Sequence, residues 1–211
     1  RCKSEVKNWS CSKMKAAFFL GNRRIEIREV DRPKAGPSDA VVRVGACGIC
    51  GTDLWLYDIW PDVPPGFVPP SLSKQDLLKT IPGHETSGTI VEVGGSVEGF
   101  RVGDKVAVNA LAFCGECTNC RTGADFCGKA GAFGTSRNGG YAEYIKVPRT
   151  NLLKLPNDLS VEDGNLLLDV IGVPNRAVRK AGVQKDDTAA VYGCGNMGLS
   201  MIQILHLHGV E

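Results

Sequence analysis

Four cysteines lie close together near the middle of the chain. They fall in the stretch CGECTNCRTGADFC, at Cys114, Cys117, Cys120 and Cys127. This CxxCxxC spacing with one further cysteine can surround a single tetrahedral zinc ion, for which thiolates are good ligands. Four thiolates leave no open coordination position, so this zinc would stabilise the lobe around it and perform no reaction. An iron–sulfur cluster and uncoordinated thiols are the alternatives.

The remaining cysteines comprise one close pair and three scattered residues. Cys47 and Cys50 form the pair, whereas Cys2, Cys11 and Cys194 lie apart. Nine cysteines in 211 residues are also compatible with a disulfide framework. We favour metal binding, because we recognise no secretion signal and the chain is larger than the small scaffolds that depend on disulfides.

A second metal site is predicted from residues far apart in the sequence. Cys50 lies in GICGTD, His84 in PGHE and Asp169 in LLLDV. Together they would provide three protein ligands and leave the fourth position of a zinc ion open to a water or substrate oxygen. Zinc in such a site acts as a Lewis acid on an alcohol or carbonyl oxygen. Glu85 directly follows His84 and is an occasional additional ligand.

Taken singly, each of these residues is more often structural than metal-binding. For Asp169 the alternative is an aspartate that caps a helix or faces solvent, because LLLDV precedes a segment with helical periodicity. The prediction of a catalytic zinc therefore requires that the separate segments meet in the folded chain.

A glycine motif near residue 195 indicates a dinucleotide site. GCGNMG fits the pattern GxGxxG, follows the strand-like TAAVY and precedes the helical stretch LSMIQILHL. The motif alone is a weak signal, but this strand and helix supply the context that a dinucleotide fold requires. Its glycines allow a tight turn and a close approach of the pyrophosphate to the positive end of the helix. The predicted contacts are Gly193, Gly195, Asn196, Met197 and Gly198.

The elements that must position these residues are short strands, from residue 15 to about 147. Turn signals rich in Gly, Pro and Asp separate them, which favours an irregular β-barrel. The strand-like stretches are IEIREV at 25–30, VVRVGA at 41–46, TIVEV at 89–93 and KVAV at 105–108. Residues 57–82 differ, because they hold six prolines and three aromatic residues, together with SLSKQDLLK, which can form one or two helical turns. We interpret them as an insertion loop.

Helical periodicity begins after Leu155, in VEDGNLLLDVIG and PNRAVRKAG. We therefore divide the chain into an N-terminal extension at 1–13, a catalytic domain at 14–155 and the incomplete start of a cofactor domain at 156–211. A second parallel strand should begin where the sequence reaches Glu211. The apolar face of LSMIQILHL is patterned to cover a sheet.

The composition excludes several classes of protein. Twenty-five basic and 23 acidic residues give a net charge of +2, without a basic run that would suggest nucleic acid or a membrane surface as partner. No segment has the apolar length of a transmembrane helix. We therefore expect a cytoplasmic globular protein.

In combination, several stretches resemble the zinc-containing medium-chain alcohol dehydrogenase family, which includes polyol, threonine and secondary-alcohol dehydrogenases. They occur in the family's order between Met14 and Glu211. These stretches are ACGICGTD, IPGHETSGTIVEVG, VEGFRVGDKVAV, the four-cysteine lobe, NGGYAEYIKVP and the unit around GCGNMG. The resemblance implies a GroES-like β-barrel catalytic domain followed by the start of an α/β doubly wound (Rossmann) domain.

The resemblance also implies roles for individual residues. Cys50 and His84 correspond to catalytic-zinc ligands, and Thr52 to the hydroxyl that takes the substrate's proton. Asp53 resembles the carboxylate that orients the ligand histidine. Trp55 departs from the family pattern, because many relatives have at this position a histidine that passes the proton to solvent.

The implied activity is hydride transfer between an alcohol, sugar or polyol and NAD or NADP, with one catalytic and one structural zinc ion per chain. The family further implies a homodimer or homotetramer for the full-length protein. Two alternatives stay open: a quinone or enoyl reductase of the same fold, and a zinc-binding GroES-like module without dehydrogenase activity of its own. The metal ligands argue against the reductase.

Overall fold

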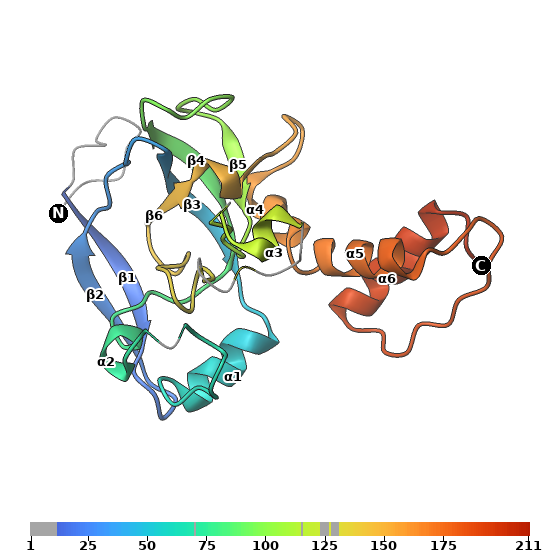
Figure 1. Cartoon of the computed structure of the whole chain (residues 1–211), viewed down its shortest axis with the longest axis horizontal. Coiled ribbons are helices and arrows are strands. Elements are labelled where there is room, and N and C mark those ends of the chain that lie inside the picture. Colours follow the sequence, from blue (N-terminus) through green and yellow to red (C-terminus); the bar gives the residue numbers. More distant parts are fainter. Residues whose placement is uncertain (1–11, 70, 115, 123–126, 128–130) are drawn as a thin grey trace. The chain divides into compact units, whose positions relative to one another are not determined.

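The computed structural model describes residues 12–69, 71–114, 116–122, 127 and 131–211, coloured along the chain in Figure 1. These residues form two compact units that divide between Asn165 and Leu166. The N-terminal extension expected at 1–13 lies outside the described residues except for its last two positions. Strand β1 begins at Lys13, one residue before the expected start of the catalytic domain.

A two-stranded sheet opens the first unit. Strand β1 (Lys13–Phe19) pairs antiparallel with β2 (Ile25–Asp31) over its whole length. Alternate residues of β1 are buried, as the period of two in a strand requires. The buried residues Met14, Ala16 and Phe18 pack against Ile81 and Tyr141.

A five-stranded antiparallel sheet, in the order β6-β3-β4-β5-β7, forms the main part of the unit. Its core contains Val42, Ile90, Val106 and Ile145, all at most 2% exposed. The predicted strands at 25–30, 41–46, 89–93 and 105–108 are all present. The five strands of this sheet are β3 (Asp39–Gly48), β4 (Glu85–Val93), β5 (Lys105–Val108), β6 (Tyr144–Pro148) and β7 (Leu152–Lys154). The result is the β-rich domain that the strand pattern indicated.

The register of β3 and β4 determines where the predicted zinc ligands lie. Gly48, the last residue of β3, pairs with Glu85, the first residue of β4. Cys50 follows the first of these positions and His84 precedes the second. Both residues therefore leave the same edge of the sheet.

The described part of segment 57–82, interpreted above as an insertion loop, contains helical turns and packs into an apolar cluster. Its beginning belongs to helix α1 (Gly51–Ile59), and SLSKQDLLK forms the short helix α2 (Lys74–Leu77), capped by Ser73. Trp60 is 3% exposed and donates its indole N–H to the Leu77 carbonyl oxygen at 3.1 Å. The helical turn α2 was predicted from the sequence. The separate apolar cluster around Trp60 was not predicted.

Four short helical turns complete the first unit and its boundary. They are α3 (Thr118–Arg121), α4 (Val161–Gly164) and 3₁₀ helices at Arg149–Asn151 and Asn165–Leu167. Helix α4 packs on β3, β4 and β5. This contact places the division between units ten residues later than the boundary expected after Leu155.

The second unit contains two helices. Helices α5 (Gly172–Ala181) and α6 (Asn196–Leu207) pack together through Val178 and Leu205. Other apolar residues of α6 are exposed, including Leu199 at 50% and Ile202 at 44%. This agrees with a helix whose apolar face is patterned to cover a sheet.

The strand expected at 188–192 does not form in the described part of the chain. A strand needs a hydrogen-bonded neighbour, and here only the final residue provides one. The Glu211 N–H donates to the Asp187 carbonyl oxygen at 2.9 Å, and Glu211 accepts from the Ala189 N–H at 2.8 Å. This alternation is the pattern of parallel strands, so Glu211 lies at the predicted start of a second parallel strand.

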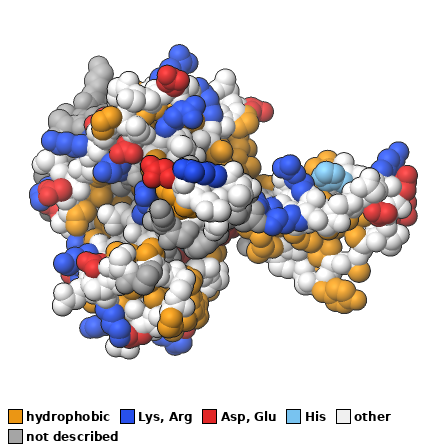
Figure 2. Space-filling view, viewed as in Figure 1, with side chains coloured by type: hydrophobic (Ala, Val, Ile, Leu, Met, Phe, Trp, Pro, Cys, Tyr) orange, Lys and Arg blue, Asp and Glu red, His pale blue; other side chains and the backbone are white. Residues whose placement is uncertain are grey.

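Figure 2 shows basic and acidic side chains interspersed on the visible face. The longest described helix has 12 residues, and none in the described ranges combines the length and apolar character that a membrane span needs.

Candidate functional site

Cys50 is held at the N-terminus of α1. Its sulfur accepts a hydrogen bond from the Thr52 backbone N–H at 3.2 Å. The Asp53 carboxylate in turn accepts from the Cys50 backbone N–H at 3.0 Å. These reciprocal bonds form a capping box, which fixes the start of the helix and the direction of the Cys50 side chain.

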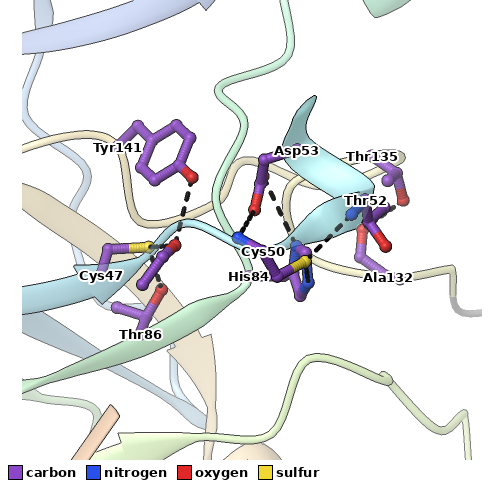
Figure 3. A network of polar contacts seen from close by, with 10 residues as sticks. Cys47, Cys50, Thr52, Asp53, His84, Thr86, Ala132, Thr135 and Tyr141 are labelled. Carbon is purple, nitrogen blue, oxygen red and sulfur yellow. Dashed lines mark hydrogen bonds and ion pairs between the residues drawn. The ribbon is translucent and has the colours of Figure 1, made fainter. Parts of the chain in front are cut away.

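The fold brings His84 to this sulfur. The distance from Cys50 Sγ to His84 Nε2 is 3.2 Å, across 34 positions of sequence. The ligand atoms of Cys50, His84 and the buried Glu85 all lie within 4.8 Å of one another. In Figure 3, Cys50 and Asp53 lie beside the His84 ring, and a dashed line marks the contact between Asp53 and the ring. The structure thus assembles a thiol, an imidazole and a carboxylate, a donor set that suits zinc.

Burial makes charge costly at this site. It raises the pKa of the Cys50 thiol, and the backbone N–H groups of Asp53 and Thr52 offset this only in part. The Asp53 Oδ1 atom is buried and has no hydrogen-bond partner among the described residues. A cation bound by Cys50 and His84 would stabilise the thiolate and increase the attraction between Asp53 and the imidazole. The residues therefore fit a bound zinc ion.

Cys47, three residues before Cys50, has a different environment. Its sulfur lies 3.4 Å from Thr86 Oγ1, and burial raises the pKa of the thiol to about 12. Cys47 is a protonated packing residue at neutral pH. The two members of the close cysteine pair therefore have separate roles.

Asp169 belongs to the second unit. It does not occupy the N-cap of α5, which is Ile171, although its carbonyl oxygen accepts the Val173 N–H at 3.4 Å. The capping role considered for it is therefore not supported, and its role as third ligand stays a prediction.

The four-cysteine lobe brings its sulfurs together around α3. A tetrahedral zinc with Zn–S bonds of about 2.3 Å places its sulfurs about 3.8 Å apart. The Sγ atoms of Cys114 and Cys120 are 3.8 Å apart, and Cys117 lies 3.4 Å from Cys120 and 3.8 Å from Cys127. None of the seven described cysteines forms a disulfide. The backbone N–H groups of Glu116 and Cys117 lower the pKa of the Cys114 thiol, which favours metal binding.

The glycines at the start of α6 have the backbone geometry that a dinucleotide turn requires. Gly193 has a φ of +99°. A Cβ added at Gly195 would meet no atom within 4 Å, which leaves room for a ligand to approach. A Cβ at Gly198 would lie 1.8 Å from the Gly193 carbonyl oxygen. Asn196 and Met197 form the first turn of α6, whose N–H groups suit a pyrophosphate.

Tyr141 lies in the stretch NGGYAEYIKVP, but no role for it was predicted from the sequence. Its hydroxyl donates to the Gly48 carbonyl oxygen at 3.1 Å, as Figure 3 shows. Burial and the negative charge of Asp53 raise the pKa of its phenol, so the hydroxyl remains a donor. Only the presence of the motif marked this residue, because its contacts arise from segments distant in sequence.

A family model described as the alcohol dehydrogenase GroES-like domain matches residues 36–157. The chain belongs to the zinc-type alcohol dehydrogenase family. The matched residues include β3, the Cys50 and His84 segments and the four-cysteine lobe.

Relatives of known name agree with this membership. The chain is 37% identical over 203 residues to (R,R)-butanediol dehydrogenase of Bacillus subtilis (strain 168), covering 93% of this chain and 56% of the relative. It is similar to the structure of a zinc-binding dehydrogenase from Sinorhizobium meliloti 1021 bound to NADP, with a TM-score of 0.80, 32% identity and coverage of 95% and 55%. A cobalt- and zinc-bound thermostable alcohol dehydrogenase from Pyrobaculum aerophilum gives a TM-score of 0.78, 28% identity and coverage of 94% and 58%. The chain thus spans about half the length of these relatives.

Proposed function

We propose that this chain is the zinc-binding part of a dehydrogenase that transfers a hydride between a small alcohol, sugar or polyol and NAD or NADP. The observation that carries the proposal is the approach of Cys50 Sγ to His84 Nε2 at 3.2 Å, with Glu85 beside them. A quinone or enoyl reductase without zinc would have no use for this donor set or for the four-cysteine lobe.

Cys50, His84 and Asp169 would hold the catalytic zinc, with Glu85 as an occasional ligand. When bound, zinc supplies Lewis acidity at the substrate oxygen. Thr52 lies in the first turn of α1, directly after the Cys50 segment, and would accept the substrate's hydroxyl proton while releasing its own toward solvent. A nicotinamide cofactor, when bound, would accept the hydride from the carbinol carbon, so that an alcohol would become a carbonyl compound.

The second metal site has only a structural role in this proposal. Cys114, Cys117, Cys120 and Cys127 would surround a zinc ion completely, which leaves no position for substrate. Both sites need reduced thiols, which supports a cytoplasmic location. As the family implies, the full-length protein would be a homodimer or homotetramer.

Metal analysis tests the proposal directly. The purified chain should contain two zinc ions, of which a chelator removes one rapidly. Zinc X-ray absorption should show four sulfur ligands for the slow ion and mixed sulfur, nitrogen and oxygen ligands for the fast one. Iron in the four-cysteine lobe would rule out the structural zinc, and zinc only in that lobe would rule out a catalytic zinc at Cys50 and His84.

A further inference from the structure

The two proposed ligands of the catalytic zinc come from separate segments, whose distance from one another must be fixed by other residues. Cys50 follows the end of β3 at Gly48, and His84 precedes the start of β4 after Gly83. The pairing of Gly48 with Glu85 aligns the two strand ends. This pairing does not determine the position of the Gly83 turn relative to the end of the sheet.

Tyr141 contacts both segments. Its hydroxyl donates to the Gly48 carbonyl oxygen at 3.1 Å, two residues before Cys50. Its ring lies directly on Gly83, where an added Cβ would be 2.5 Å from the Tyr141 Cδ1 atom. Gly83 also has a φ of +92°, so glycine is favoured there both by conformation and by the ring.

The backbone around Tyr141 is anchored to the same turn. The Tyr141 N–H donates to the Pro82 carbonyl oxygen at 3.0 Å, and the Gly140 N–H to the Gly83 carbonyl oxygen at 2.9 Å. On its other side Tyr141 accepts the Ala17 N–H at 2.8 Å, from strand β1. The backbone that carries the ring is thus held by one strand, β1, and by the turn at Pro82 and Gly83.

From these contacts we propose that Tyr141 is a positioning residue that sets the distance between Cys50 and His84 at the catalytic zinc. Tyr141 bridges the Gly48 carbonyl oxygen and the Gly83 turn. It would act through the backbone at these two glycines and not by touching the side chain of Cys50 or His84. The inference rests on the proposed function, because it assumes that these two residues bind zinc.

Two substitutions separate the contributions of the hydroxyl and the ring. Tyr141→Phe removes the hydroxyl that bonds Gly48 and interacts with Asp53, and it should accelerate release of the labile zinc about fivefold, the effect of one lost hydrogen bond. Tyr141→Leu also removes the ring from Gly83 and should weaken that site by about 10- to 100-fold. Zinc in the four-cysteine site should be unaffected in both variants.

Tyr144 provides matched controls in the same motif. Its ring stacks on the Arg32 guanidinium, 4.3 Å from the ring centroid, and it makes no described contact with Gly48 or Gly83. Tyr144→Phe and Tyr144→Leu should leave labile-zinc release within about twofold of wild type. The two Tyr144 variants control for a general loss of packing, because they remove the same side-chain atoms as the Tyr141 variants at a position three residues away.

The experiment measures release of zinc from the full chain to a coloured chelator, and the visible spectrum after cobalt replaces the labile ion. The Tyr141 variants should release metal faster and shift the cobalt bands, which report ligand geometry, whereas the Tyr144 variants should do neither. If Tyr141→Leu fails to fold, Tyr141→Phe decides the question.

Two contrary outcomes are distinguishable. Wild-type protein without a labile metal ion would refute the proposed function itself. The second outcome is a wild-type protein that holds a labile ion, together with unchanged release rates and spectra in Tyr141→Phe and in any folded Tyr141→Leu. This outcome would refute only the role of Tyr141.

Discussion

The Asp53 carboxylate lies 3.7 Å from Nδ1 of His84, and both side chains are largely buried. The other oxygen of the same carboxylate accepts the Cys50 N–H. Asp53 therefore links the two proposed zinc ligands through one side chain. With Nδ1 directed at a carboxylate, the Nε2 atom of His84 is left for the metal.

Asp53→Ala should weaken the catalytic zinc by about 10- to 100-fold, because the His84 ring loses the group that orients it. Asp53→Asn should have a smaller effect, since its amide oxygen can still accept from one of the two partners, His84 or Cys50, whereas its NH2 group must face the other. Competition between the protein and a zinc chelator measures both. Equal affinity of wild type and Asp53→Ala would contradict an orienting role.

Removal of one cysteine from each metal site should have different consequences. Cys50→Ser should reduce the zinc content from two ions to one and leave the melting temperature nearly unchanged. Cys117→Ser should lower the melting temperature by roughly 5–10 °C, because the lobe loses a metal that contributes to folding. Elemental analysis and thermal unfolding compare the two. Equal destabilisation by both substitutions would contradict the division of roles.

Asp169→Asn tests the third ligand. A lost carboxylate should weaken the labile zinc by at least about tenfold without changing the four-cysteine site. Asp158→Asn, at an exposed position of the first unit, is the matched control for the loss of one negative charge. Unchanged zinc affinity in Asp169→Asn would exclude Asp169 and make Glu85 the remaining carboxylate candidate.

Asp104 predicts a dependence of stability on pH. Burial acts to raise its pKa, but hydrogen bonds from the Lys154 side chain and the Arg101 N–H outweigh it and hold the pKa below its usual range. The Lys154 Nζ atom lies 2.8 Å from the carboxylate. Because the folded pKa is the lower one, this stabilisation is present above the unfolded pKa of about 4 and is lost as pH falls through the folded value.

Asp104→Asn should therefore lower the free energy of unfolding by about 1–2 kcal/mol at pH 7, and the difference should shrink as the pH falls below about 4. Urea unfolding at several pH values measures this. Asp31→Asn, which removes an exposed ion pair with Lys13, should change stability little at any pH. A deficit for Asp104→Asn that persists undiminished at low pH would contradict the assignment.

The 211-residue chain should bind NAD and NADP weakly, with a Kd above about 1 mM. A dinucleotide site requires adjacent parallel strands, and Glu211 contributes only the first hydrogen bonds of a second one. Calorimetric titration with each cofactor checks this, together with an assay on a panel of alcohols and sugars. Micromolar binding and sustained turnover would show that the site is assembled in another way.

The sequence by itself determined the features that depend on local spacing. Four cysteines within 14 positions can reach one ion because the short chain between them keeps their sulfurs close. The turn at Gly193 and the start of α6 likewise follow from adjacent residues, because φ and close packing there require glycine. The prediction that Cys50 pairs with His84 was supported by the resemblance to a family, because the motifs that contain the two residues occur in that family's order.

Tertiary structure alone decided what depends on register and on contacts between distant segments. The pairing of Gly48 with Glu85 brings Cys50 to His84, and a one-residue shift of register would turn the strand side chains to the opposite face. The contacts of their sulfurs distinguish Cys47 from Cys50, since the first lies against Thr86 and the second against His84, although both are cysteines near one strand end. Likewise, residues 188–192 have strand character in sequence but form no ladder in the described chain, because a strand requires a hydrogen-bonded neighbour along its length.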